Sequence, residues 1–144
     1  LVSDVAPLNG LIRTAIARDP RAITAMKDPT RGGVASALHE LAAKSRVAIV
    51  LDEAALPVRD ATRGVAELVG IDPLLVANEG KALLGVKAAF ADAVLASLRS
   101  HPLGADAAII GTCTDDRSGQ VILDTGFGRR FIAEPEGELL PRIC

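Results

Sequence analysis

Residues 23–45 read ITAMKDPTRGGVASALHELAAKS, a short apolar run followed by a proline, two glycines and a helical apolar period. The run Ile23 to Met26 stops at Lys27-Asp28-Pro29, where the acidic residue and the proline, which has no backbone N–H for a strand, end it. From Val34 onward, apolar residues recur at positions 34, 38, 41 and 42, which lie on one face of a helix. The stretch therefore predicts a strand, a glycine-rich turn and a helix of about a dozen residues.

The rest of the chain continues this alternation of short apolar runs and helical periods. Helices are expected at 6–18, 61–69 and 90–99, and strands at 47–51, 74–77, 82–86, 107–113, 120–124 and 130–132. Ser3 or Asp4 is expected to cap the first helix. Asn78 to Lys81 is predicted to join two strands as a tight hairpin, and Asp115 to Gly119 is predicted to be a further turn. Antiparallel neighbours and interspersed helices predict an α+β fold with helices packed on a sheet.

Composition indicates one domain and excludes several function classes. The chain has 144 residues, 49% of them apolar, which suffices for one core without a metal or disulfide. Its 16 basic and 18 acidic residues are interspersed, and it has three Phe and no Trp or Tyr, which argues against nucleic-acid binding and an anionic membrane. Lys87 and Asp92 interrupt the most apolar stretch, so no membrane span is expected and a cytoplasmic protein is predicted.

Two cysteines are present, and they lack the spacing of a zinc site, so no metal centre is expected. Cys113 is expected to be a small core residue in a strand. Cys144 is the last residue, after a segment that mixes acids, prolines and glycine without a period. A thiol at the end of such a tail is mobile and nucleophilic, which suggests a carrier, although a free thiol that is merely last remains an alternative.

The same patterns suggest where the folded domain ends and the tail begins. Residues 1–132 are predicted to form the domain and residues 133–144 a mobile tail that carries the cysteine. The chain begins with Leu1 in mid-pattern rather than with Met, so an N-terminal part is expected to be missing.

Two loops carry side chains that suit a reaction site. Asp28, Thr30, Arg31, Gly32 and Gly33 precede a helix, where freed backbone N–H groups and a guanidinium suit an anion. The alternative is an ordinary helix start in which Asp28 or Thr30 is the cap.

The other loop is Asn78-Glu79-Gly80-Lys81. It presents Glu79 as a possible general base, the alternative being a solvated hairpin tip. His39 is expected to be a surface residue of its helix.

Four blocks carry a resemblance to a known family: residues 3–8, 26–33, 77–81 and the terminal Pro141-Arg142-Ile143-Cys144. They resemble the HypE family of hydrogenase maturation proteins, within the superfamily of aminoimidazole-ribonucleotide-synthetase-like (AIR-synthetase-like) enzymes. The resemblance implies a C-terminal domain with a three-layer α/β/α sandwich and a mixed, largely antiparallel sheet. It also implies an absent N-terminal domain that supplies most of an ATP site, with Mg²⁺, and a homodimer interface.

The resemblance further implies a reaction. HypF would transfer a carbamoyl group to Cys144, and ATP-dependent dehydration would turn it into a thiocyanate. The cyano group would pass to iron on a HypC–HypD complex, for a [NiFe] hydrogenase. In this scheme Cys144 is the carrier, Glu79 the candidate base, and Asp28, Thr30, Arg31, Gly32, Gly33 and Asn78 lie near the nucleotide phosphates. The isolated fragment is expected to be inactive.

Two other functions stay open on the sequence. One is an ATP-dependent phosphotransferase or synthetase of the same superfamily that acts on a free small substrate. The other is a non-catalytic docking module for maturation partners.

Overall fold

A computed structural model describes residues 5–135 of the chain. Its elements, in chain order, are α1 (Asn9–Arg18), β1 (Ile23–Lys27), α2 (Gly33–Ser45), β2 (Ala48–Asp52), η1 (Glu53–Ala55), α3 (Asp60–Val69), η2 (Pro73–Leu75), β3 (Leu83–Val86), η3 (Ala88–Phe90), α4 (Ala91–Arg99), η4 (Pro102–Gly104), β4 (Gly111–Thr114), β5 (Val121–Asp124) and β6 (Arg129–Phe131), where η denotes a 3₁₀ turn. Within residues 5–135, no helix is both long and apolar enough to cross a bilayer.

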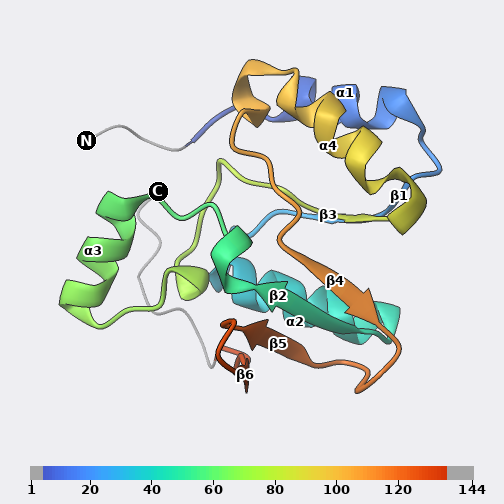
Figure 1. The fold of residues 1–144 in the computed structure, drawn as a ribbon. Coiled ribbons are helices and arrows are strands. Elements are labelled where there is room, and N and C mark those ends of the chain that lie inside the picture. Colours follow the sequence, from blue (N-terminus) through green and yellow to red (C-terminus); the bar gives the residue numbers. More distant parts are fainter. Residues whose placement is uncertain (1–4, 136–144) are drawn as a thin grey trace.

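The strands form two sheets (Figure 1). Four of them lie in the order β4-β2-β5-β6, and β1 pairs with β3 in a two-stranded ribbon. The β2–β5 pair is parallel, whereas β1–β3, β2–β4 and β5–β6 are antiparallel. The predicted α+β class with mixed, largely antiparallel pairing is therefore confirmed, although the strands divide between two sheets.

The larger core lies between α2 and the four-stranded sheet. Leu38 of α2 packs with Leu51 of β2 and Leu123 of β5, all of them buried. Because side chains alternate along a strand, the residues of β2 and β5 that face α2 are those with odd numbers in this region. This packing fixes the position of α2, and so of its N-terminus, relative to the four-stranded sheet.

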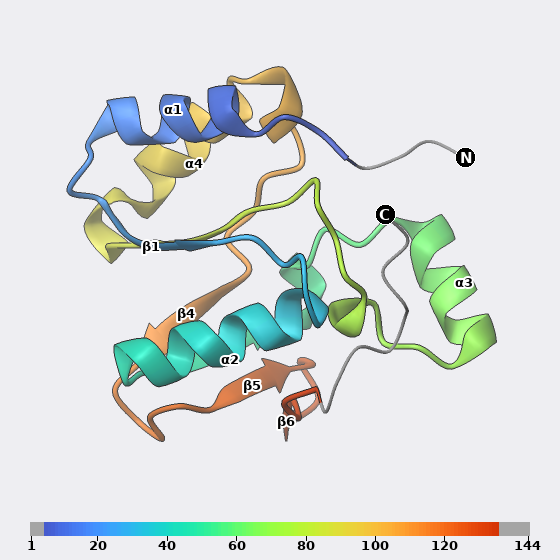
Figure 2. The ribbon, with the colours of Figure 1, turned by 180° about the vertical axis from the view of Figure 1, so that it is seen from behind.

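The smaller core lies between α1, α4 and the ribbon. Ala15, Ala22 and Val94 are its fully buried residues, and Ile23 and Leu84 of the ribbon pack against them. Figure 2 shows α1 and α4, then the ribbon, then α2 in succession from top to bottom, which is the expected α/β/α layering, with the four-stranded sheet against α2.

A carboxylate ties the ribbon to α2. Glu40 of α2 lies 3.0 Å from Lys27 Nζ at the end of β1 and 3.1 Å from Lys44 Nζ on its own helix. Hydrogen bonds from Lys27 and then Lys44 hold the pKa of Glu40 below its usual value. The end of β1, just before the glycine turn, is thus attached to the helix that follows it.

The hairpin predicted around Asn78 is wrong. Residues 73–75 form the 3₁₀ turn η2, whose Leu74 N–H donates to the Asp72 carboxylate at 2.9 Å. Leu74 is buried in the larger core, so its apolar run is used for packing on α2 rather than for a strand. β3 pairs instead with β1, with Met26 opposite Leu84.

The predicted turn at residues 115–119 is confirmed and joins β4 to β5. These two strands are not neighbours, since β2 lies between them, and Gly119 N–H donates to Val47 O just before β2. Helix α1 begins at Asn9, and Leu8 is its N-cap without a side-chain hydrogen bond, so the predicted cap by Ser3 or Asp4 is wrong.

Candidate functional site

The turn between β1 and α2 connects the ribbon to the helix that packs on the four-stranded sheet. Asp28 is exposed, whereas Pro29 is among the fully buried residues. Helix α2 starts at Gly33, and its N-cap is Gly32 in the left-handed conformation, φ +63°, without a side-chain hydrogen bond. The alternative in which Asp28 or Thr30 caps the helix is therefore wrong, because the chain enters α2 through a conformation that favours glycine.

Gly33 lets the start of α2 touch another backbone segment. A Cβ at this position would lie 2.5 Å from Leu74 O and 2.8 Å from Leu75 C and Val76 O, and its φ is +66°. The absence of a side chain thus brings the residues that follow η2 against the N-terminus of α2. Packing is the role that the structure gives this glycine, and its proximity to a nucleotide phosphate stays a prediction.

This contact brings the two predicted loops together. Asn78 N–H donates to Pro29 O at 3.0 Å, and Asn78 Oδ1 accepts from Gly80 N–H at 3.1 Å. The second bond closes a side-chain turn around Glu79, so the carboxylate is presented on an exposed residue at a defined place.

Asp28 and Glu79 line one open hollow of about 650 Å³. The other residues around it are Ala6, Leu8, Ile12, Met26, Lys27, Lys44, Lys81 and Ala82. Asn78 lies beside a lining residue, since it binds Pro29, which follows Asp28. The remaining predicted site residues within 5–135 do not line the hollow: Asn78, Thr30, Arg31, Gly32 and Gly33. A carboxylate that accepts a proton and lysines that attract an anion are thus available in one place.

The chain after β6 returns to α2. Ile132 is buried in the larger core, and its carbonyl oxygen lies 2.9 Å from His39 Nε2. His39, predicted as a surface residue, is half-buried, and its side chain binds a residue 93 positions away. No local pattern signals such a contact. Cys144, the predicted carrier, lies outside the described residues.

Cys113 differs from its prediction as well. It is exposed, because β4 is an edge strand while the core against α2 is built from β2 and β5. Partial desolvation raises the pKa of its thiol, which lowers its thiolate fraction at neutral pH.

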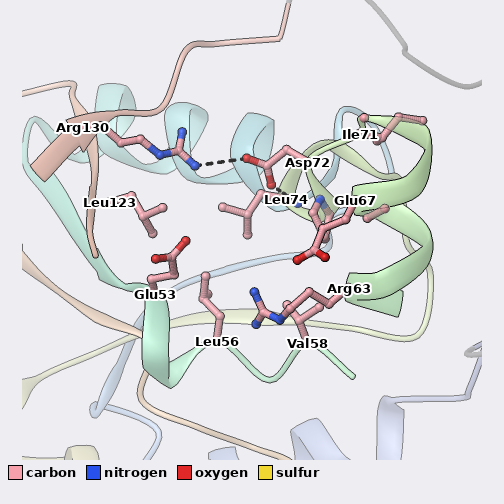
Figure 3. Close-up of a pocket in the computed structure, with 13 residues that line it drawn as sticks. Glu53, Leu56, Val58, Arg63, Glu67, Ile71, Asp72, Leu74, Leu123 and Arg130 are labelled. Atoms are coloured by element: carbon pink, nitrogen blue, oxygen red, sulfur yellow. Dashed lines mark hydrogen bonds and ion pairs between the residues drawn. The ribbon is translucent and has the colours of Figure 1, made fainter. Parts of the chain in front are cut away.

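A second cavity, which the sequence did not suggest, lies between η1, α3, η2 and the β5–β6 edge. It measures about 290 Å³. Figure 3 shows Glu53, Arg63 and Glu67 pointing into it, with Arg130 and Asp72 in contact at 3.4 Å on its rim. No predicted site residue within residues 5–135 lines this cavity, so the hollow with Asp28 and Glu79 is the candidate site.

Comparison with known families identifies the domain. The family model described as AIR synthase related protein, C-terminal domain, matches residues 2–124. The chain belongs to this family. Within it, the chain is 49% identical over its whole length to a protein named carbamoyl dehydratase HypE from Escherichia coli strain K12, and it covers 42% of that protein.

Solved structures agree with this membership of the AIR synthase related family. A HypE–HypF complex superposes with a TM-score of 0.88 at 42% identity, over 94% of this chain and 44% of the matched chain. A HypE in complex with ATP gives a TM-score of 0.86 at 36% identity, over 95% of this chain and 43% of that chain. The resemblance to HypE is therefore confirmed, and the chain spans about two fifths of the length of the curated relatives that it matches.

Proposed function

We propose that this domain is the C-terminal part of an ATP-dependent carbamoyl dehydratase for [NiFe]-hydrogenase maturation, and that Cys144 carries the reacting group. The observation that carries the proposal is the 49% identity to a named carbamoyl dehydratase, which extends over the whole chain. The placement of Asp28 and Glu79 in one hollow adds a site with suitable chemistry.

The proposed reaction converts an S-carbamoyl group, S–CO–NH₂, into a thiocyanate, S–C≡N. The carbonyl oxygen attacks the terminal phosphorus of ATP and ADP leaves. The C–O bond then breaks with phosphate as the leaving group, while the nitrogen loses both of its protons. A sulfur atom suits this carrier role because a thiolate is a good nucleophile and can later release the group.

Removal of the nitrogen protons requires a base close to the sulfur. Glu79 is the candidate, because its loop is held against the Asp28 turn and its carboxylate lines the hollow. Lys27 and Lys81 line the same hollow and favour the negative charge that develops on the departing phosphate. Asp28, Thr30, Arg31, Gly32, Gly33 and Asn78 are the candidates for the nucleotide side, and a further N-terminal domain would bind most of the ATP and its Mg²⁺.

The proposal includes partners. HypF would supply the carbamoyl group, as the superposition on a HypE–HypF complex supports. A HypC–HypD complex would accept the cyano group, the full-length protein would be a homodimer, and the reaction would take place in the cytoplasm.

The test uses the full-length protein with a carbamoyl donor, HypF and ATP. Intact-mass spectrometry should show a carbamoyl adduct on the wild type that loses water when ATP is present. Cys144→Ala should show neither species, because the carrier atom is gone. An adduct of the same size on this variant would contradict the carrier role, and activity after deletion of residues 141–144 would favour a free small substrate.

Glu79→Gln separates the two chemical steps. This variant should form the carbamoyl adduct at the wild-type rate and accumulate it, with thiocyanate formation slower by about 10²- to 10⁴-fold. Glu67→Gln, at an exposed position of α3 outside the hollow, is the matched control and should behave as the wild type. Equal thiocyanate formation by Glu79→Gln would refute the assignment of the base.

A further inference from the structure

The C-terminal segment is fastened to the domain at Ile132. Its N–H donates to Val121 O at 2.9 Å, its carbonyl accepts from His39 at 2.9 Å, and its side chain is 5% exposed in the larger core. Because a carbonyl oxygen only accepts, the Nε2 atom of His39 carries the proton of this bond. Ile132 is therefore held by the sheet, by α2 and by the core.

From Ile132 the chain runs toward the start of α2. A Cβ on Gly32 would lie 3.8 Å from Pro135 Cγ, so Pro135 lies beside the turn that precedes the helix. Three extended residues cover about 10 Å. The seven residues from His39 back to Gly32 also cover about 10 Å along a helix axis. The two lengths match, which indicates that residues 132–135 follow α2 in a nearly extended path.

This path ends at the loop pair that builds the candidate site. Gly32 belongs to the same turn as Asp28, and Pro29 of that turn binds Asn78, next to Glu79. A group on a tether has a higher effective concentration at its target when the tether starts beside that target than when a tether of equal length starts elsewhere. The fastening at Ile132 thus leads the described chain to Pro135, beside this turn.

We infer that His39 is a positioning residue, which fastens the C-terminal segment at Ile132 and directs Cys144 toward the Asp28–Glu79 hollow. The inference rests on the proposed function for its catalytic consequence, but the fastening itself does not depend on it. His39 touches no reacting atom and acts through the backbone of Ile132.

The test compares His39→Leu, which has no donor, with His39→Gln, whose amide can donate at similar reach. Ala43→Leu is the matched control, since it adds a leucine at an exposed position of the same helix. In the full-length protein, hydrogen exchange of the Ile132 amide, which donates to Val121 O, should rise about tenfold in His39→Leu and stay near wild type in the other two. Unchanged exchange in His39→Leu would overturn the fastening.

The second measurement follows conversion of the S-carbamoyl group on Cys144. In His39→Leu, kcat should fall about threefold to tenfold with an unchanged KM for ATP, and His39→Gln should restore most of it. A peptide of residues 136–144 with an S-carbamoyl cysteine, supplied to proteins that also carry Cys144→Ala, needs no fastening and should react equally with and without His39→Leu.

The outcomes separate the claims. If kcat in His39→Leu equals that of the wild type, His39 has no role in the reaction, and the positioning role is overturned. If His39→Leu lowers the rate with the supplied peptide as much as it lowers the rate with the attached segment, His39 supports the domain in general, and the positioning role is overturned as well. If the wild type forms no thiocyanate at all, the proposed function fails, and the positioning role of His39 fails with it. The exchange measurement then still decides whether His39 fastens the segment.

Discussion

At the scale of single residues, the consecutive glycines of the β1–α2 turn have the clearest physical explanation. Gly32 and Gly33 both have positive φ, and Gly33 also lies against the carbonyls of Leu74 and Val76. The sequence suggested that these glycines free backbone N–H groups for an anion. The structure shows that they bring two loops together, so they shape the site whether or not they touch a ligand.

Gly33→Ala should therefore destabilise the domain by about 2–4 kcal/mol, because the new Cβ adds a backbone clash to a strained φ. Gly64→Ala is the matched control: a Cβ there meets nothing within 4 Å, and the residue is inside α3. Its helix propensity should stabilise the protein by up to about 1 kcal/mol. Urea unfolding of both variants measures the difference, and a loss below about 1 kcal/mol for Gly33→Ala would contradict the contact.

At the scale of elements, α3 is the helix that is least attached. It lies apart from the layers in Figure 1, and Ala66 is its only buried residue. Val65, Leu68 and Val69 are 64%, 88% and 59% exposed, and with Ala61 they form one stripe at helical spacing. Amphipathicity alone predicted the helix correctly, but it did not reveal that residues 5–135 leave the apolar stripe uncovered.

Leu68→Gln should consequently change the stability of this chain by less than about 0.5 kcal/mol, since the side chain is exposed before and after the change. Leu38→Ala in α2 is the comparison, because it opens a cavity in the larger core and should cost about 2–5 kcal/mol. Thermal unfolding of the two variants tests the contrast. Similar losses would mean that α3 is packed more tightly than its exposure indicates.

At the scale of the whole molecule, the charges form exposed local pairs rather than a single patch. Arg21, the lysines beside Glu40, and Arg129 hold the pKa values of Asp19, Glu40 and Asp124 below their usual values. Each pair joins neighbouring parts of the fold or closes a turn. Together these pairs make the domain less stable when the pH falls into the acid range.

A depressed carboxyl pKa stabilises the fold above the unfolded value, 3.8 for Asp and 4.5 for Glu, and this contribution is lost as the pH falls through the folded value. The melting temperature should therefore be nearly constant from about pH 8 to 6 and fall below about pH 4.5. Circular dichroism melts across this range check the profile.

Glu40→Gln is the variant that tests the cause. It removes the carboxylate that links β1 to α2, so its melting temperature should fall less steeply between about pH 5 and 3. An unchanged slope would show that Glu40 contributes nothing to the acid dependence.

Local sequence determined the strands at 23–27 and 48–52, helices α2, α3 and α4, and the glycine-rich turn after Asp28, because apolar periods, proline and glycine act within a few residues. It also supplied the motifs that led to the correct family. Only the tertiary structure decided that β3 pairs with β1, that β2 lies between β4 and β5, and that Asn78 binds Pro29. It alone placed His39 against Ile132. The physical reason is that core packing and backbone pairing join segments far apart in the chain, and no local pattern contains that information.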